Sequence, residues 1–450
     1  MSDSIALLHC LLPTLTRTTI RQFSRIILAL LAMTGRVTMR GIARWAGAGG
    51  SYRTVQRCFA TALPWASLFW RFFRAHLFRH TDVYLLGGDE TVVTKAGKQP
   101  HGLDRFFASL YGKPVPGLAC FALSLISIQQ RRSFPIQIEQ VVRTAAGKAA
   151  TRAKQRAKAS PDPACTRKPG RPKGSTTTAK TAVDLTPELT RIQTMVRQVL
   201  ARIGTLVPVT YLVLDGHFGN NTALQMTRRC NLHLIAKLRA DSALYLPYTG
   251  PYAGRGPRRI YGDKLDLQAL PAHALRQTTD TDGIVTRSYQ LEVRHKSFAQ
   301  PLNLVVIVKT NQRTQRQAHV LLFSSDLTLS FAHLIDYYGL RFQLECNFRD
   351  AKQCWGLEDF MQTTPTAVTN AANLACFMVN FAERLLQDGR HHQPDWSVLD
   401  LQAYYRGSKY VEETIKLLPE KPEPILLARI HATIVRLGRI HAAPADSLVA

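Results

Sequence analysis

The sequence predicts an α/β fold with a basic, all-α region in front of a mixed sheet, and three observations lead to this prediction. Residues 1–80 carry apolar residues at helical spacing, with arginines recurring every four positions. From residue 83 onward, short apolar runs predict strands, and helical patterns separate the later ones. Hydrophobic residues make up 46% of the 450 residues, which is enough for a packed core in a chain of several folded units.

The charge of the chain indicates a polyanionic partner. Lys and Arg number 58 against 31 Asp and Glu, so the formal net charge is +27. Each phosphate that a basic side chain neutralises releases counterions, so such a charge favours nucleic acid. A ribosome-associated protein or a protein of the membrane surface is the alternative that charge alone leaves open.

The cysteines and the apolar segments point to a reduced, intracellular protein without a membrane partner. The eight cysteines form no C-x-x-C pair, so neither a disulfide framework nor a zinc knuckle is expected. The apolar segment at residues 26–33 is too short to span a bilayer, and it does not begin the chain as a signal peptide would.

Residues 1–80 are expected to form a helical, basic DNA-binding domain. Thr38 can cap a short helix, a glycine-rich break follows, and Ser51 can cap a second helix. Arg53 and Arg57 share one face of that second helix and are the expected DNA contacts. Helix, glycine turn and basic helix fit a helix-turn-helix, and an ordinary helical bundle with a solvated basic face is the alternative.

Residues 81–241 are expected to form the first part of an α/β core. Strand-like runs begin near residues 83, 117 and 134 and predict an antiparallel meander. The later elements alternate between helix and strand, at residues 187–203, 209–214, 221–230 and 233–238. Three strands followed by helix, strand, helix and strand is the order of an RNase H-like fold.

A basic segment interrupts this core at residues 144–186. It is rich in Lys, Arg, Ala, Thr and Pro, cannot bury a core, and is expected to be a disordered loop. Its G-R-P-K stretch, with Arg171 and Lys173, resembles an AT-hook, which lays an arginine into a narrow minor groove. A generic basic tether is the alternative.

Three further regions complete the expected organisation. Residues 242–327 carry strand-like runs between Pro and Gly clusters and are expected to form a β-rich insertion. Residues 328–390 return to long helices and should supply the second part of the core. Residues 391–450 are expected to be a C-terminal helical region.

Two aspartates occupy positions that suit a catalytic site. Asp89 lies within an apolar strand, where a carboxylate is costly unless it is paired or binds a metal. Asp215 lies at the C-terminal end of a strand, where sheet enzymes place their ligands. Taken separately, either residue could be an ordinary turn or cap residue.

A column of four residues is more specific. Arg341 precedes Glu345 by four residues, Tyr338 lies seven residues before Glu345, and Lys352 lies seven after it. At about 100° per residue, the four side chains fall on one face of a single long helix. Such a column suits phosphate handling, and a solvated face of ion pairs is the alternative.

In residue type and spacing, this column matches the Y-R-E-K signature of bacterial insertion-sequence transposases of the cut-and-paste type, and the chain resembles that family. Asp89 in a D-E-T-V motif and Asp215 in a D-G-x-F-G motif resemble the first two carboxylates of the family's DDE core. The resemblance covers roughly residues 80–390. The basic N-terminus and the G-R-P-K loop also resemble what this group carries.

The resemblance implies that Asp89, Asp215 and Glu345 are the catalytic residues and bind two Mg²⁺ ions, for which Mn²⁺ substitutes. Two ions suit an in-line phosphoryl displacement, and carboxylate oxygens suit hard cations. The other residues of the signature would contact DNA phosphates: Tyr338, Arg341 and Lys352.

The expected function is therefore transposition of double-stranded DNA. A homodimer or larger synaptic complex would bind terminal inverted repeats and target DNA, and would cut and join the strands in the bacterial cytoplasm, at the nucleoid. A transposase-derived DNA-binding protein that no longer cuts is one alternative. An RNase H-like nuclease without strand transfer is another.

Four nearby side chains have weaker expectations. Glu90 should not be a ligand, because neighbouring strand residues point to opposite faces. Lys95 and Lys98 could contact phosphates. His217 could touch DNA or metal-bound water, or have only a structural role.

Family members with a β insertion at this point can use a tryptophan to hold a flipped base while a DNA hairpin forms. This chain has no tryptophan between Trp70 and Trp355, so the sequence supports metal-dependent strand cleavage but gives less support to a hairpin route. Four tyrosines of the insertion could stack on a base instead: Tyr245, Tyr248, Tyr252 and Tyr261.

Overall fold

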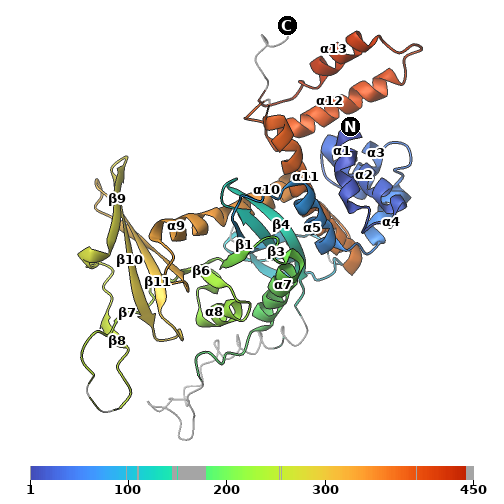
Figure 1. Cartoon of the computed structure of the whole chain (residues 1–450). Helices are drawn as coiled ribbons and strands as arrows, with labels where there is room; N and C mark the ends of the chain where they lie inside the picture. Colours follow the sequence, from blue (N-terminus) through green and yellow to red (C-terminus); the bar gives the residue numbers. More distant parts are fainter. Residues whose placement is uncertain are drawn as a thin grey trace.

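The computed structural model describes residues 2–97, 99–108, 111–143, 149, 179–252, 254, 256–391 and 393–441. In these residues, a mixed sheet of 12 strands has helices packed on its core part, and part of the sheet projects away from them (Figure 1). The expected α/β class is thereby confirmed. The segment expected to be a basic loop lies almost wholly outside the described residues, and so do Arg171 and Lys173.

Six strands make up the core part of the sheet: β1 (Tyr84–Thr94), β2 (Asp104–Ala108), β3 (Lys113–Ser127), β4 (Arg132–Val141), β5 (Val209–Val213) and β6 (His233–Leu238). The strands β1, β3 and β4 form an antiparallel meander, and β5 and β6 lie parallel to β1 on its other side. This arrangement agrees with the RNase H-like order expected from the sequence. The short strand β2, which pairs with β3, was not predicted.

The inserted strands extend the same sheet rather than building a second one. Their bounds are β7 (Leu244–Pro247), β8 (Tyr261–Lys264), β9 (Leu275–Thr281), β10 (Ile284–His295), β11 (Leu302–Asn311) and β12 (Gln317–Ser324). The last of them, β12, pairs antiparallel with β6, and β11 and β10 follow in order. Figure 1 shows these strands, in yellow, reaching away from the core.

The N-terminal helices are α1 (Ser2–Ala6), the 3₁₀ helix η1 (Leu7–Leu11), α2 (Arg17–Ala32), α3 (Met39–Trp45), α4 (Tyr52–Ala60) and α5 (Trp65–His76). The caps predicted for α3 and α4 are confirmed, since Thr38 accepts from the Gly41 N–H at 3.0 Å and Ser51 from the Thr54 N–H at 3.3 Å.

These helices share one hydrophobic core with the rest of the chain. Phe377, in the middle of α11 (Pro365–Arg390), packs against the rings of Phe23, Trp65 and Phe72, with centroids 5.5, 6.2 and 5.1 Å away. The N-terminal helices therefore do not have a separate core, and the boundary expected at residue 80 does not divide the packing.

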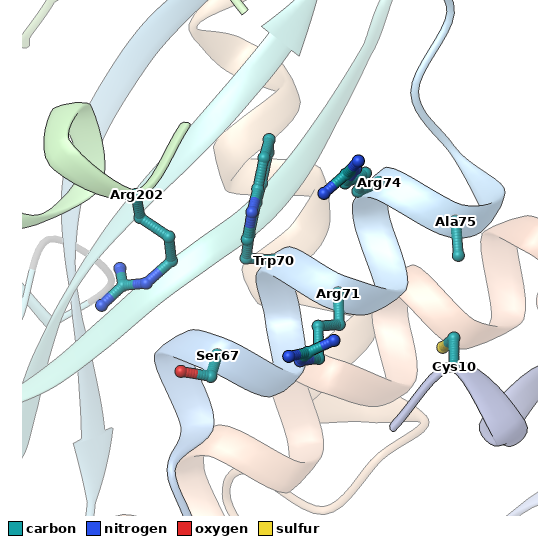
Figure 2. Close-up of a pocket in the computed structure, with 7 residues that line it drawn as sticks. All are labelled: Cys10, Ser67, Trp70, Arg71, Arg74, Ala75 and Arg202. Carbon is teal, nitrogen blue, oxygen red and sulfur yellow. The ribbon is translucent and has the colours of Figure 1, made fainter. Parts of the chain in front are cut away.

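Other helices cover the sheet. α5 and α11 pack on β4, whereas α7 (Pro187–Ile203) and α8 (Asn221–Arg228) precede and follow β5. A pocket lies between α5 and the C-terminal end of α7 (Figure 2). The C-terminal helices α12 (Val398–Ile415) and α13 (Pro424–Ile434) follow α11. No helix of the described residues is both long and apolar enough to cross a membrane.

The long helix expected after Ser330 is in fact two helices, α9 (Phe331–Leu340) and α10 (Phe342–Gln353). They meet at Arg341, whose N–H donates to the Tyr338 carbonyl at 3.2 Å, three residues back rather than four. This tight turn follows Gly339, and glycine is a poor helix former. The junction sets the direction in which α10 meets the sheet.

Candidate active site

Asp89 lies in the middle of β1, with its side chain 16% exposed. Two glycines precede it, and a Cβ at Gly87 would stand 3.0 Å from a methyl of Leu344 and 2.6 Å from one of Ile126. A side chain at this position would require the ends of the Leu344 and Ile126 side chains to shift. Gly87 thus leaves room for the helix of Glu345 to pack on the strand of Asp89.

Asp215 follows β5, which lies parallel to β1. Gly87 pairs with Val213 across these two strands, so the positions two residues further along, Asp89 and Asp215, are neighbours at the same level. Oδ1 of Asp215 accepts from the His217 N–H at 3.1 Å, which begins a short 3₁₀ turn. Parallel pairing therefore brings the two aspartates together.

Glu345 lies in the first turn of α10, four residues after Arg341. The guanidinium of Arg341 bridges two carboxylates: Nη1 is 2.7 Å from Asp89 Oδ2, and Nη2 is 2.7 Å from Glu345 Oε1. The Arg341 side chain is only 15% exposed. The structure thus brings all three predicted carboxylates to one place, with a buried guanidinium between two of them.

The carboxylates influence each other electrostatically. Burial raises the pKa of Asp89, Arg341 lowers it, and the negative charges of Asp215 and Glu345 raise it, with a net pKa of about 6. Several like charges held together at a half-buried position favour a cation among them. In this structure, the cation is the side chain of Arg341.

A cleft of about 650 Å³ opens beside the carboxylates, and Asp215, Tyr338 and Arg341 are among its lining residues. The guanidinium of Arg341 lies 5.9 Å from the centre of the Tyr338 ring. Basic side chains from β6 and β12 and from the turn after β6 complete the lining: Lys237, Arg239 and His319. A carboxylate cluster with a basic rim suits a phosphate-bearing ligand.

Sequence reasoning did not find these three basic residues. Lys237 and Arg239 lie at the end of β6, which runs parallel beside β5. The rule that pointed to Asp215, that ligands gather where parallel strands end, could have found them. His319 reaches the cleft only because β12 pairs with β6, and no local pattern indicates that pairing.

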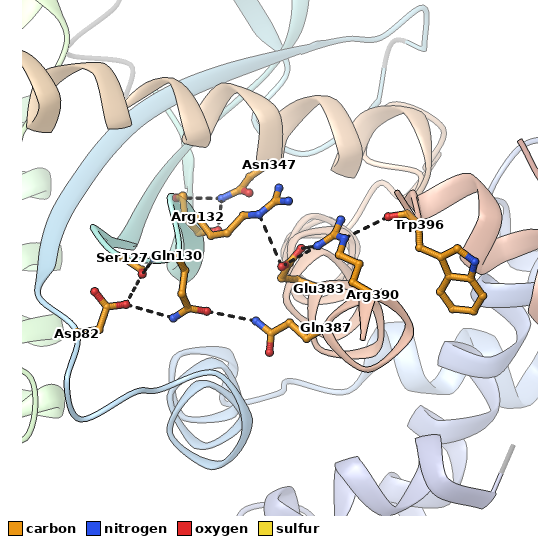
Figure 3. Close-up of polar contacts among 10 residues, drawn as sticks. Asp82, Ser127, Gln130, Arg132, Asn347, Glu383, Gln387, Arg390 and Trp396 are labelled. Atoms are coloured by element: carbon orange, nitrogen blue, oxygen red, sulfur yellow. Dashed lines mark hydrogen bonds and ion pairs between the residues drawn. The ribbon is translucent and has the colours of Figure 1, made fainter. Parts of the chain in front are cut away.

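A polar network holds α10 in place (Figure 3). Nδ2 of Asn347 donates to both the carbonyl and the hydroxyl of Ser133, each at 3.0 Å, and so ties α10 to β4. Next to it, Glu383 of α11 pairs with Arg132 at 3.7 Å and with Arg390 at 3.1 Å. The helix that carries Glu345 is thus fixed to the sheet by side chains well outside the cleft.

The structure places Lys352 away from the carboxylates. Its ammonium donates to the Val92 carbonyl at 3.0 Å and lies 3.7 Å from a carboxylate oxygen of Glu358. It is not among the residues that line the cleft. Of the expected column, Tyr338, Arg341 and Glu345 therefore gather at the site, whereas Lys352 contacts the edge of β1.

Lys95 is not a phosphate contact. Its side chain is buried, and Nζ donates to the carbonyls of Glu358 and Phe360, each at 2.8 Å. The ammonium also lies 3.7 Å from the centre of the Phe360 ring. The expectation for Lys95 was wrong because the segment after α10 folds back over the end of β1. Lys98 lies outside the described residues.

Glu90 and His217 both face α7. Burial and the nearby charge of Glu188 raise the pKa of Glu90. Since Glu188 belongs to α7, the side chain of Glu90 lies on the opposite side of β1 from that of Asp89. His217 lies 3.6 Å from Glu188 and is largely exposed. That contact raises the pKa of His217.

Arg53 and Arg57 lie on the exposed face of α4. Neither guanidinium has an ion pair or hydrogen bond with any residue that the structure describes. The turn that precedes α4 is held by Arg25 of α2, whose Nη1 donates to the Gly49 carbonyl at 3.0 Å. The basic face is therefore free to meet a ligand and rigidly attached to the rest of the N-terminal helices.

Three carboxylates are a donor set that suits a hard divalent cation such as Mg²⁺. As the side chains stand, however, no three His, Cys, Asp or Glu residues in the described part of the chain are arranged to hold a metal ion. In this arrangement Arg341 is bound to both Asp89 and Glu345. The chemistry of the donor set fits a metal, provided that Arg341 moves away.

Comparison with known proteins shows the family of the chain. Residues 10–296, more than half of the chain, match the family model described as DDE superfamily endonuclease. The matched span contains Asp89 and Asp215 and ends before the helix of Glu345. No curated protein matches the chain.

Proposed function

Since the chain belongs to the DDE superfamily endonucleases, we propose that it is a DNA transposase of the cut-and-paste, Y-R-E-K type. It would bind the terminal inverted repeats of an insertion sequence, cleave the DNA strands and transfer them to a target. The observation that carries the proposal is that Arg341 bridges Asp89 and Glu345, while Arg341 and Asp215 line the same cleft, which has a basic rim.

In this proposal, Asp89, Asp215 and Glu345 hold divalent metal ions, Mg²⁺ or Mn²⁺. Such ions, when bound, would activate the attacking oxygen and stabilise the leaving one. Arg341 has a different task, because a guanidinium binds phosphate oxygens in the same two-pronged way in which it now binds two carboxylates. The arrival of DNA would thus give Arg341 a new partner and free the carboxylates.

The remaining residues of the cleft would hold the strand in position. The hydroxyl of Tyr338 would donate to a phosphate beside Arg341. Lys237 and Arg239, both exposed at the end of β6, would neutralise neighbouring phosphates. Lys352 can contact a phosphate only if its ammonium leaves the Val92 carbonyl. Breaking that hydrogen bond costs little, because Lys352 is partly exposed.

Contacts outside the cleft would recognise the DNA ends. The exposed face of α4, with Arg53 and Arg57, suits the major groove of the inverted repeat. Arg171 and Lys173 are proposed to lie in a minor groove, as an AT-hook does. A homodimer or larger complex would bring two ends together, because cut-and-paste transposition needs both.

The test is DNA cleavage by wild type and two matched variants. Asp215→Asn should abolish Mg²⁺-dependent nicking of DNA that carries the inverted repeats, while its affinity for that DNA changes less than threefold. Glu90→Gln, which removes a neighbouring carboxylate on the other face of β1, should cleave like wild type. Nicking by Asp215→Asn at the wild-type rate would overturn the proposal.

A second measurement separates transposition from simple hydrolysis. A donor with both inverted repeats is incubated with a target plasmid, and joined products are sequenced across the junction. Joined ends flanked by short direct repeats are expected. Cleavage without any joined product would indicate a nuclease rather than a transposase. Tight DNA binding without cleavage in Mg²⁺ or Mn²⁺ would indicate a DNA-binding protein that no longer cuts.

A further inference from the structure

The pocket between α5 and the end of α7 has a volume of about 420 Å³ and is rich in arginine. Its seven lining residues contain no Asp or Glu: Cys10, Ser67, Trp70, Arg71, Arg74, Ala75 and Arg202. It shares no residue with the carboxylate cleft. A hollow lined by three cations and no anion attracts a ligand with several negative charges.

Helical spacing explains why α5 presents these groups together. Ser67, Trp70, Arg71 and Arg74 recur at intervals of three and four residues, so they share one face of the helix. The opposite face buries the large apolar residues of α5 in the core. The arginine face is therefore held rigidly, because the rest of the helix cannot rotate.

The charges of this pocket have no counterpart in the protein. Arg71 and Arg74 are exposed, and neither makes an ion pair or a hydrogen bond with any described residue. Arg202 is partly buried, and its only side-chain hydrogen bond in the described part of the chain is a donation to Oε1 of Gln137 at 3.4 Å. Burial lowers the pKa of Arg202, as expected for a cation without a nearby carboxylate.

An aromatic ring stands among the three guanidinium groups. Figure 2 shows Trp70 between the side chain of Arg202 and those of Arg71 and Arg74. The indole is stacked on Phe73, with ring centroids 6.0 Å apart and planes 24° apart. Arginines that neutralise phosphates, interleaved with a fixed aromatic ring, are the combination that binds a nucleic-acid strand.

We propose that this pocket is a second DNA-binding site, in which Arg71, Arg74 and Arg202 hold backbone phosphates of DNA that runs outside the carboxylate cleft. The inference rests on the proposed function, which makes DNA the substrate, and adds a binding surface to it. The pocket would strengthen binding without contributing to the chemistry, because none of its residues lies in the cleft.

The test measures how DNA affinity depends on salt. Each lost phosphate contact should reduce the slope of log K against log salt by about 0.9. The double variant Arg71→Ala, Arg74→Ala should therefore have a slope lower by about 2. Over a threefold rise in salt, wild type should lose roughly sevenfold more affinity than the double variant. Arg202→Ala should lower the slope by about 1.

Arg313→Ala, which removes an exposed arginine from the turn between β11 and β12, is the matched control and should leave the slope unchanged. Circular dichroism verifies that each variant is folded. A double variant with the wild-type slope would overturn the proposal, and so would an equal fall in the slope of the control.

The outcomes separate this site from the proposed function. If wild type nicks DNA and the double variant has the wild-type salt slope, the DNA-binding role of the pocket is rejected and the proposed nuclease activity stands. If the double variant has a reduced salt slope but wild type does not nick DNA, the proposed chemistry is rejected and the DNA-binding role of the pocket stands. Quenching of tryptophan fluorescence by DNA should also be smaller in Trp70→Phe than in wild type, and equal quenching would argue against a strand at this ring.

Discussion

The guanidinium of Arg341 lies 2.7 Å from the carboxylate of Asp89 and joins the start of α10 to the middle of β1. Both side chains are largely shielded from water, so their attraction is stronger than that of an exposed pair. The second nitrogen of the same guanidinium holds Glu345 at 2.7 Å. One side chain therefore offsets part of the negative charge of the carboxylate cluster.

This arrangement predicts that Arg341 competes with metal ions. Arg341→Ala should bind Mn²⁺ about tenfold more tightly than wild type in the absence of DNA, because the competing charge is gone. Isothermal titration calorimetry measures the affinity directly. DNA cleavage by the same variant should fall, since the proposed phosphate contact is lost as well.

Arg349→Ala is the control for that experiment. Arg349 belongs to the same helix, is exposed, and among the residues that the structure describes pairs only with its neighbour Asp350, at 3.0 Å. Its removal should leave Mn²⁺ affinity unchanged. Equal or weaker Mn²⁺ binding by Arg341→Ala would show that the arginine does not stand in the place of a metal ion.

Asn370 predicts a large loss of stability on substitution. Its Nδ2 donates to the carbonyls of Phe59 and Thr61, and its Oδ1 accepts from Nε1 of Trp65, each at 2.7 Å. Asn370→Leu removes the partner of two buried polar groups and of the partly exposed Thr61 carbonyl, and should lower the free energy of unfolding by about 3 kcal/mol. Urea unfolding measures the change.

Asn373→Leu is the matched control on the same helix. Asn373 is equally buried, but its Nδ2 donates only to a carbonyl of its own helix, at 2.9 Å. Its replacement should cost about 1 kcal/mol. Equal losses for the two variants would mean that the contacts of Asn370 with the N-terminal helices add nothing to stability.

The buried ammonium of Lys95 is expected to make the free energy of unfolding rise with pH in the alkaline range. Burial lowers the pKa of Lys95 from 10.5 to about 8. Between these two values the unfolded chain binds the proton and the folded chain does not, so the free energy of unfolding increases with pH across this window. From pH 7 to 9.5, wild type should gain about 2 kcal/mol relative to Lys95→Met.

Urea unfolding of both proteins at pH 7 and 9.5 measures this difference. The comparison with Lys95→Met removes the contributions of all other titrating groups, which the two proteins share. A difference that stays constant between the two pH values would show that Lys95 keeps an ordinary pKa in the folded state.

The basic face of α4 predicts a loss of DNA affinity. Arg53→Ala with Arg57→Ala should weaken binding to the inverted repeat at every salt concentration tested and reduce the salt slope by about 2. Fluorescence anisotropy with labelled DNA gives both quantities. An affinity equal to that of wild type would remove α4 from the DNA interface.

Local patterns predicted most of the secondary structure. Apolar runs indicated β1, β3 and β4, and the caps Thr38 and Ser51 marked where α3 and α4 begin, because capping depends on residues close in the chain. The short strand β2 was missed, since its five residues make a ladder only by pairing with β3. The break between α9 and α10 was missed as well.

The sequence by itself determined where the three candidate carboxylates lie, with Asp89 in a strand, Asp215 at a strand end and Glu345 on a helix, and the resemblance to transposases singled them out as a set. Only the tertiary structure decided what surrounds them. The register of β1 against β5 and the approach of α10 over Gly87 brought them together, with Arg341 between Asp89 and Glu345.

The same distinction between local pattern and tertiary structure explains the positions of Lys95 and Lys352 and the formation of the arginine pocket. The sequence pattern includes Lys352 in the column of four and gives Lys95 a weaker expectation, but the fold buries Lys95 and turns Lys352 toward β1. The arginine pocket joins α5 to α7, elements more than 100 residues apart. Spacing along a chain reports on one helix or strand, whereas contacts between elements depend on packing and register, which no local pattern encodes.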